Sequence, residues 1–143
     1  MTAQKECIFC AIVDGRAPAR PVADDGKTLA FLDIFPLTRG HTLVIPKRHC
    51  DSLLDCPPED LAAVGAMAQR VARATLDPAG LAADGVNLLQ ANGAVAFQTV
   101  FHFHVHVLPR YNGDGFRLPF ERHPGVESEL EADKAKLVAS LQP

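Results

Sequence analysis

The chain has 143 residues, of which 48% are hydrophobic and 22% charged, and its formal net charge is −3. These values predict a single domain over residues 1–143 and exclude a strongly basic nucleic-acid-binding protein. No apolar run is long enough to cross a bilayer, and residues 1–6 lack the pattern of a secretion signal. We expect a cytoplasmic protein that binds neither nucleic acid nor membranes, with its four cysteines as thiols or metal ligands.

The first part of the chain predicts a short helix, a hairpin and a buried strand. Residues 7–13 are mostly apolar and predict one or two helical turns. The Asp24-Asp25-Gly26 turn joins an extended stretch near Val22 to a strand over residues 27–32. Residues 42–46 are nearly all apolar, which predicts a strand buried on both faces.

The second part adds two helices and two strands. A helix starts at Pro57-Pro58-Glu59-Asp60 and continues to about Leu76, since apolar residues repeat at helical spacing. A strand is expected over residues 85–91, followed by a turn at Asn92-Gly93. After a further strand, residues 110–124 predict an irregular loop and residues 127–141 a charged helix. This order predicts an α+β fold with a mostly antiparallel sheet.

The further strand carries an unusual pattern, because apolar residues and histidines alternate without a break from Phe101 to Val107. Alternation indicates a β-strand with His102, His104 and His106 on one face and the apolar side chains on the core face. Imidazole can serve as a nucleophile, a proton carrier or a metal ligand near neutral pH. Two chemistries are open, namely nucleophilic catalysis by a histidine, or a catalytic zinc held by a His-x-His pair.

A Cys-x-x-Cys motif stands at Cys7 and Cys10. It is compatible with a redox pair, with half of a zinc site, or with two small buried residues. A redox pair is expected beside a parallel βαβ unit, which this sequence does not predict. Cys50 and Cys56 belong to no motif and are interpreted as ordinary residues.

The alternating histidines, preceded by Gln98-Thr99-Val100, resemble the signature of the histidine triad (HIT) superfamily. The resemblance extends to residues 7–10, 29–34 and 41–47 and so covers nearly all of the chain. It implies the HIT fold, with one long central helix and a C-terminal helix, and a homodimer that joins the two sheets. The N-terminal half is similar to the nucleoside phosphoramidases of the superfamily, whereas residues 108–116 are similar to its dinucleoside polyphosphate hydrolases.

The resemblance also implies an activity, which is hydrolysis or transfer at the α-phosphate of a purine nucleotide. The middle histidine of the family attacks the phosphorus and forms a covalent nucleotidyl intermediate, and His104 matches that position. His106 matches the histidine that positions the phosphate and leaving group, and Asp33 matches an aspartate that accepts both ribose hydroxyls. The neutral donors that would take up phosphoryl charge are Asn92, Gln98 and Thr99. The apolar positions that would enclose the base are Ile8, Phe9, Phe31, Ile34 and Leu43. A nucleotide-binding or partner-binding protein with incidental hydrolysis is the alternative.

A structural zinc site follows from the same resemblance. HIT proteins with this Cys-x-x-Cys use a histidine after Pro-Lys-x and the first triad histidine as the other two ligands. The matching residues here are Cys7, Cys10, His49 and His102. Two thiolates and two imidazoles fill a tetrahedral site and leave no position for a reactive water, so the zinc would be structural.

One position departs from the family pattern. HIT proteins usually have glycine directly before Gln-Ser/Thr-Val, and its backbone approaches the phosphate, but this chain has Phe97. A side chain and a more restricted backbone at this position should reshape the mouth of the site. His41 matches a fourth family histidine near the triad, with a surface turn histidine as the alternative.

Overall fold

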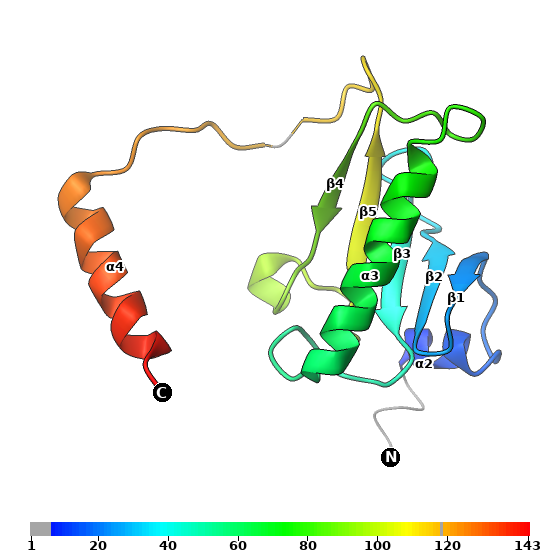
Figure 1. The fold of residues 1–143 in the computed structure, drawn as a ribbon, viewed down its shortest axis with the longest axis horizontal. Coiled ribbons are helices and arrows are strands. Elements are labelled where there is room, and N and C mark those ends of the chain that lie inside the picture. The colour runs from blue at the N-terminus through cyan, green and yellow to red at the C-terminus, as the bar shows by residue number, and fades with distance from the viewer. Residues whose placement is uncertain (1–6, 118) are drawn as a thin grey trace.

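The computed structural model describes residues 7–117 and 119–143, which include a five-stranded antiparallel sheet (Figure 1). The strands in chain order are β1 (Pro21–Asp24), β2 (Thr28–Leu32), β3 (Thr42–Pro46), β4 (Gly85–Leu89) and β5 (Val105–Arg110). Their spatial order is β1-β2-β3-β5-β4, so β5 lies between β3 and β4. This arrangement confirms the predicted α+β fold with an antiparallel sheet.

The helices are α2 (Ile8–Val13), α3 (Pro58–Thr75), the short 3₁₀ helix η1 (Ala94–Ala96) and α4 (Glu127–Leu141). α3 begins at a proline and has Glu59 and Asp60 in its first turn, where the helix dipole favours acidic residues. It runs across one face of the sheet, whereas α4 lies apart at the end of an extended segment and buries no residue (Figure 1). None of the described helices is long and apolar enough to cross a membrane.

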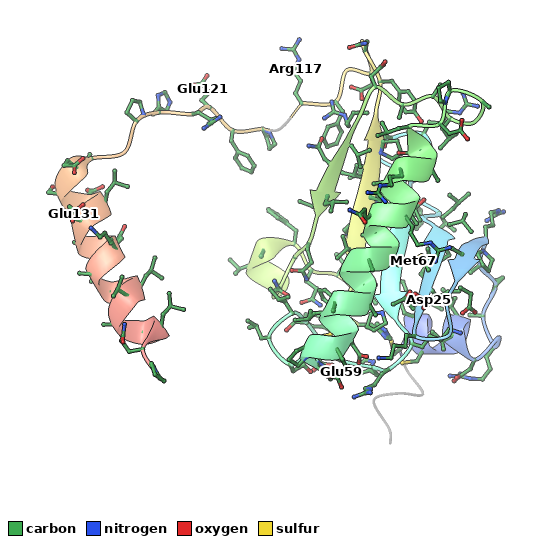
Figure 2. The ribbon with its side chains drawn as sticks, in the orientation of Figure 1. Asp25, Glu59, Met67, Arg117, Glu121 and Glu131 are labelled. Atoms are coloured by element: carbon green, nitrogen blue, oxygen red, sulfur yellow. The ribbon has the colours of Figure 1, made fainter. Side chains whose placement is uncertain are left out.

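The core has two parts, one on each face of the sheet. Val64, Met67 and Val71 of α3 pack against Ala30 and Val44 on one face, and Met67 is completely buried where the helix crosses the sheet (Figure 2). On the other face Phe9 of α2 packs with a second set of strand residues, Leu29, Phe31, Leu43 and Ile45. β3 is therefore buried on both faces, which explains its unbroken apolar run.

The strand that carries the histidines is shorter than predicted. β5 begins at Val105 rather than Phe101, so His102 and His104 precede it. Its ladder with β3 ends at the Val44–Val105 pair, and in the same register Pro46 would face Phe103. Pro46 has no N–H to donate, and the Phe103 N–H instead donates to the carbonyl of Cys50 at 2.7 Å.

Side-chain alternation is only partly kept in this segment. Phe103 and Val107 are buried as predicted, whereas Phe101 is half exposed. The predicted strand over residues 85–91 also ends early, at Leu89. The pattern therefore placed Phe103, Val105 and Val107 correctly against the core, although the backbone before Val105 is not a strand.

Candidate active site and metal centre

A cavity of about 520 Å³ lies beside the second and third histidines of the triad. Such a volume is within the usual range for small-ligand sites. It is lined by predicted nucleotide-binding residues from α2, β2, β3 and the segments around β5: Ile8, Phe9, Phe31, Asp33, Ile34, Leu43, Thr99, His104 and His106. Apolar side chains dominate, and the polar groups come from Asp33, Thr99 and the histidines. Asn92 and Gln98 do not line it.

A hydrogen bond to the backbone fixes the tautomer of His104. Its Nδ1 lies 2.7 Å from the carbonyl oxygen of His102, which can only accept, so Nδ1 carries the proton. The lone pair of neutral His104 is therefore on Nε2. Burial lowers the pKa of His104, and the nearby Asp33 carboxylate only partly opposes this effect. His104 is accordingly a neutral imidazole with an available nitrogen at pH 7.

His41 fixes the tautomer of His106 in the same way. The Leu37 N–H donates to His41 Nδ1 at 3.1 Å, so the proton of His41 is on Nε2. That nitrogen lies 2.8 Å from His106 Nδ1, which must accept, and 3.5 Å from Asp33 Oδ2. His106 therefore carries its proton on Nε2. Burial, together with neighbouring His104 and His41, lowers the pKa of His106 to about 4, so it is a neutral donor.

The side chains of Gln98 and Asn92 are engaged with the protein itself. Gln98 Nε2 donates to the carbonyl oxygens of Asp51 and Val100 at 2.7 and 3.1 Å. Asn92 Oδ1 accepts from the Leu53 N–H at 2.8 Å, and its Nδ2 donates to Gln90. Direct contact of either amide with a phosphate stays a prediction, and Thr99 is the neutral donor found at the cavity wall.

Cys7, Cys10, His49 and His102 form one cluster, with their ligand atoms all within 4.8 Å of one another. His102 Nδ1 lies 3.4 Å from Cys7 Sγ and 3.5 Å from Cys10 Sγ, and His49 Nδ1 lies 3.3 Å from Cys10 Sγ. Tetrahedral zinc with bonds of about 2.0–2.3 Å places its ligands about 3.5 Å apart. The cluster therefore has the composition and spacing of a zinc site.

Each imidazole of this cluster is oriented by a hydrogen bond from its Nε2 to an oxygen outside the cluster. His102 Nε2 donates to the Pro46 carbonyl at 2.8 Å, and His49 Nε2 donates to Asp51 Oδ1 at 2.8 Å. Each ring thus keeps its proton on Nε2 and turns the Nδ1 lone pair toward the two thiols. Such outer hydrogen bonds are typical of metal-binding histidines. Cys50 and Cys56 lie instead in the core beside α3, away from the cluster.

The profile of the HIT domain family matches residues 14–113 of the chain. The chain belongs to the HIT family. An uncharacterized HIT-like protein of Mycobacterium tuberculosis is 56% identical over 108 residues, which cover 76% of this chain and 74% of the relative. An adenylylsulfatase of Arabidopsis thaliana is 39% identical over 113 residues, which cover 79% of this chain and 56% of that protein.

Solved structures of HIT proteins agree with this chain in fold, and one of them is zinc-bound. A zinc-bound histidine triad family protein of Mycobacterium smegmatis is 50% identical, with a TM-score of 0.75 over 96% of this chain and 99% of that one. A histidine triad nucleotide-binding protein of Candida albicans is 30% identical, with a TM-score of 0.82 over 95% and 97%. The predicted HIT fold is therefore confirmed.

Phe97, which replaces the usual HIT glycine, keeps a backbone conformation that suits glycine. Its φ is +69°, in the left-handed region that side chains disfavour, and its N–H donates to the Ala94 carbonyl at 3.0 Å. The ring is 85% exposed. Phe97 thus combines a left-handed backbone conformation with an exposed aromatic side chain.

Sequence reasoning missed Asp51 of this HIT site and assigned no role to His41. The Asp51 carboxylate accepts a hydrogen bond from His49 of the cysteine–histidine cluster, and His41 sets the tautomer of His106. Asp51 follows His49 by two positions, where a carboxylate often has no role beyond a turn. Only the family position of His41 pointed toward the triad.

Proposed function

We propose that this protein is a nucleotide hydrolase or transferase that acts at the α-phosphate of a purine nucleotide. Nucleoside phosphoramidates and dinucleoside polyphosphates are the two substrate classes. The observation that carries the proposal is the hydrogen bond from His104 Nδ1 to the His102 carbonyl oxygen, because it leaves Nε2 of His104 unprotonated. This nitrogen lies at a cavity that Asp33 also lines. This combination offers a nucleophile and a ribose acceptor in one site.

Binding of the nucleoside uses the apolar wall and Asp33. Phe9, Phe31 and Leu43 would enclose the base, since their side chains form the buried part of the wall. Asp33 Oδ1 already accepts from the Phe35 N–H at 2.8 Å, which holds the carboxylate in place for the ribose hydroxyls. An ionised carboxylate makes stronger hydrogen bonds to hydroxyls than a neutral acceptor.

The reaction proceeds in two displacements at phosphorus. The Nε2 lone pair of His104 forms the N–P bond while the bond from phosphorus to the leaving group breaks, and that group leaves with the bonding electrons. His41 orients the His106 ring, so that its Nε2–H can donate a hydrogen bond to a phosphoryl oxygen or to the leaving group. Water or another acceptor then attacks phosphorus, and the N–P bond breaks to free His104.

The Cys7–Cys10–His49–His102 cluster fits zinc by ligand type, spacing and outer hydrogen bonds. Four protein ligands leave no coordination position for a substrate oxygen, so a bound zinc would cross-link the chain rather than take part in hydrolysis. His102 belongs to this cluster through its ring and to the active site through its carbonyl. The cluster therefore helps to hold the acceptor that orients His104.

Trapping the intermediate tests the proposal. Rapid quench into alkaline denaturant, in which the N–P bond is stable, should yield protein labelled at His104 from an α-³²P-labelled adenosine phosphoramidate. His104→Ala should abolish both label and turnover, whereas His123→Ala, outside the site, should retain both. A panel with diadenosine polyphosphates and adenylyl sulfate, chosen because of the Arabidopsis relative, would define the leaving group. Nucleotide binding without labelling would instead support a binding protein.

A further inference from the structure

Gln98 is a buried amide whose hydrogen bonds all go to the backbone. It is 4% exposed. Its Nε2 donates to the Asp51 and Val100 carbonyls, and its Oε1 accepts from the Gly93 N–H at 2.8 Å. Three separate segments are thus joined by one side chain. Removing a buried partner leaves the other group unsatisfied, which makes such a residue costly to replace.

Asp51 connects this amide to the metal cluster. Its side chain accepts from His49 Nε2 at 2.8 Å, while its carbonyl accepts from Gln98 at 2.7 Å. The Asp51 N–H also donates to Asp55 Oδ2 at 3.0 Å, which limits the movement of its backbone. One residue therefore faces the metal ligand on one side and Gln98 on the other.

Thr99 and Val100, the segment that Gln98 holds in place, lie between two surface pockets and line both of them. Thr99 and Val100 line the nucleotide cavity, and they also line a second depression together with Cys7, His49 and Asp51. Nothing but this segment and Ile8 is common to both linings. A shift of Thr99 and Val100 therefore changes the nucleotide cavity and the metal side together.

We propose that Gln98 is a positioning residue that couples metal binding at the cysteine–histidine cluster to nucleotide binding in the cavity. When the cluster is loaded, the His49 ring is fixed, Asp51 is held against it, and Gln98 keeps Thr99 and Val100 in place. When the cluster is empty, this segment is less constrained and nucleotide binding must order it. Coupling between two binding sites is reciprocal, so nucleotide must strengthen metal binding by the same factor. The inference rests on the proposed nucleotide site.

The first test measures the coupling in the wild-type full chain. Adenosine monophosphate should bind zinc-loaded protein about fivefold or more tightly than chelator-stripped protein in titration calorimetry. Saturating adenosine monophosphate should slow zinc transfer to a chromogenic chelator, a readout that needs no folded metal-free protein. Equal release rates with and without nucleotide would overturn the inference. Absence of nucleotide binding to zinc-loaded protein would overturn the proposed function as well.

The variant Gln98→Glu tests whether Gln98 carries the coupling between zinc binding and nucleotide binding. Gln98→Glu keeps the size and the acceptor for Gly93 but removes both N–H donors, so the effect of adenosine monophosphate on zinc release should fall toward one-fold. Gln90→Glu is the matched control, because Gln90 is a nearby part-buried amide that bonds only to Ala91 and Asn92. It should keep the wild-type ratio. A wild-type ratio in Gln98→Glu would show that the coupling takes another route, such as the His102 carbonyl.

Discussion

Burial keeps His104 and His106 of the cavity, and His41 beside them, uncharged. It is the main cause of the lowered pKa of His41, His104 and His106, and mutual repulsion among the imidazoles adds to it at His41 and His106. A protonated His104 would have no lone pair for phosphorus. The apolar surroundings that bind a base therefore also keep the nucleophile ready at neutral pH.

The pH dependence of kcat/KM should report this effect. Since the pKa of His104 is below the ordinary 6.5, the acid limb of kcat/KM, where Nε2 becomes protonated, should be centred below pH 6.5. Steady-state rates with adenosine phosphoramidate from pH 4.5 to 8 would measure it. Asp33→Asn removes a charge that raises the pKa of His104, so its acid limb should move to still lower pH. An acid limb centred above pH 6.5 would contradict the assignment.

Phe97 carries backbone strain that its own contacts do not explain. Its φ is positive and its ring is almost fully exposed, so the described fold gains little from the side chain. A left-handed conformation costs a side-chain-bearing residue about 1–2 kcal/mol. Strain of this kind tends to persist at functional sites.

Phe97→Gly should stabilise the protein by about 0.5–1 kcal/mol, because relief of the strain exceeds the added entropy of the unfolded chain. Urea denaturation gives the free energy of unfolding. Val95→Gly is the matched control, since Val95 is equally exposed in η1 but has a negative φ, and this variant should lose stability. A similar loss in Phe97→Gly would show that the ring packs against something outside the described contacts.

At the scale of elements, the metal cluster joins three segments that are not paired as β-strands where the ligands lie. Cys7 and Cys10 lie at the start of α2, where Cys7 Sγ also accepts from the Cys10 N–H at 3.4 Å. His49 follows β3, and His102 precedes β5. Bound zinc would hold α2 against the sheet and support the Phe9 side of the cavity.

Zinc removal should therefore act on stability first. We expect about one zinc per chain by mass spectrometry of metals in protein prepared without added zinc, and a lower Tm after chelation. Cys10→Ser should lower zinc content and Tm together. Cys50→Ser, at an equally buried cysteine outside the cluster, should keep the zinc. Full loss of activity on chelation with an unchanged Tm would show that the metal is not structural.

Local patterns predicted most elements because local chemistry decides them. The Asp24-Asp25-Gly26 turn forms as predicted, with Asp25 Oδ1 accepting from the Thr28 N–H at 2.7 Å and Gly26 at φ +88°. The predicted start of β5 was wrong because the actual start depends on Pro46 and Cys50, which are distant from it in sequence. The tautomers of His104 and His106 likewise depend on backbone groups that only the fold brings near.

At the scale of the whole molecule, two elements expose apolar side chains within the described residues. β4 is an edge strand, and its Leu88 and Leu89 are exposed. α4 lies apart from the sheet (Figures 1 and 2). It buries none of its residues and exposes Leu130, Leu137 and Leu141. Exposed apolar edge strands tend to pair with another chain. Both elements therefore favour the homodimer expected from the family.

Sedimentation equilibrium should give twice the chain mass, with two sheets joined through their β4 edges in a two-fold dimer. Leu88→Lys should shift the protein toward monomer, because a charge on the pairing edge must be desolvated or lie beside its symmetry copy. Val22→Lys is the control, since Val22 is similarly exposed on β1, the opposite edge of the same sheet. It should remain dimeric. Equal dissociation by both variants would exclude the β4 edge as the interface, and a monomeric wild type would contradict the homodimer itself.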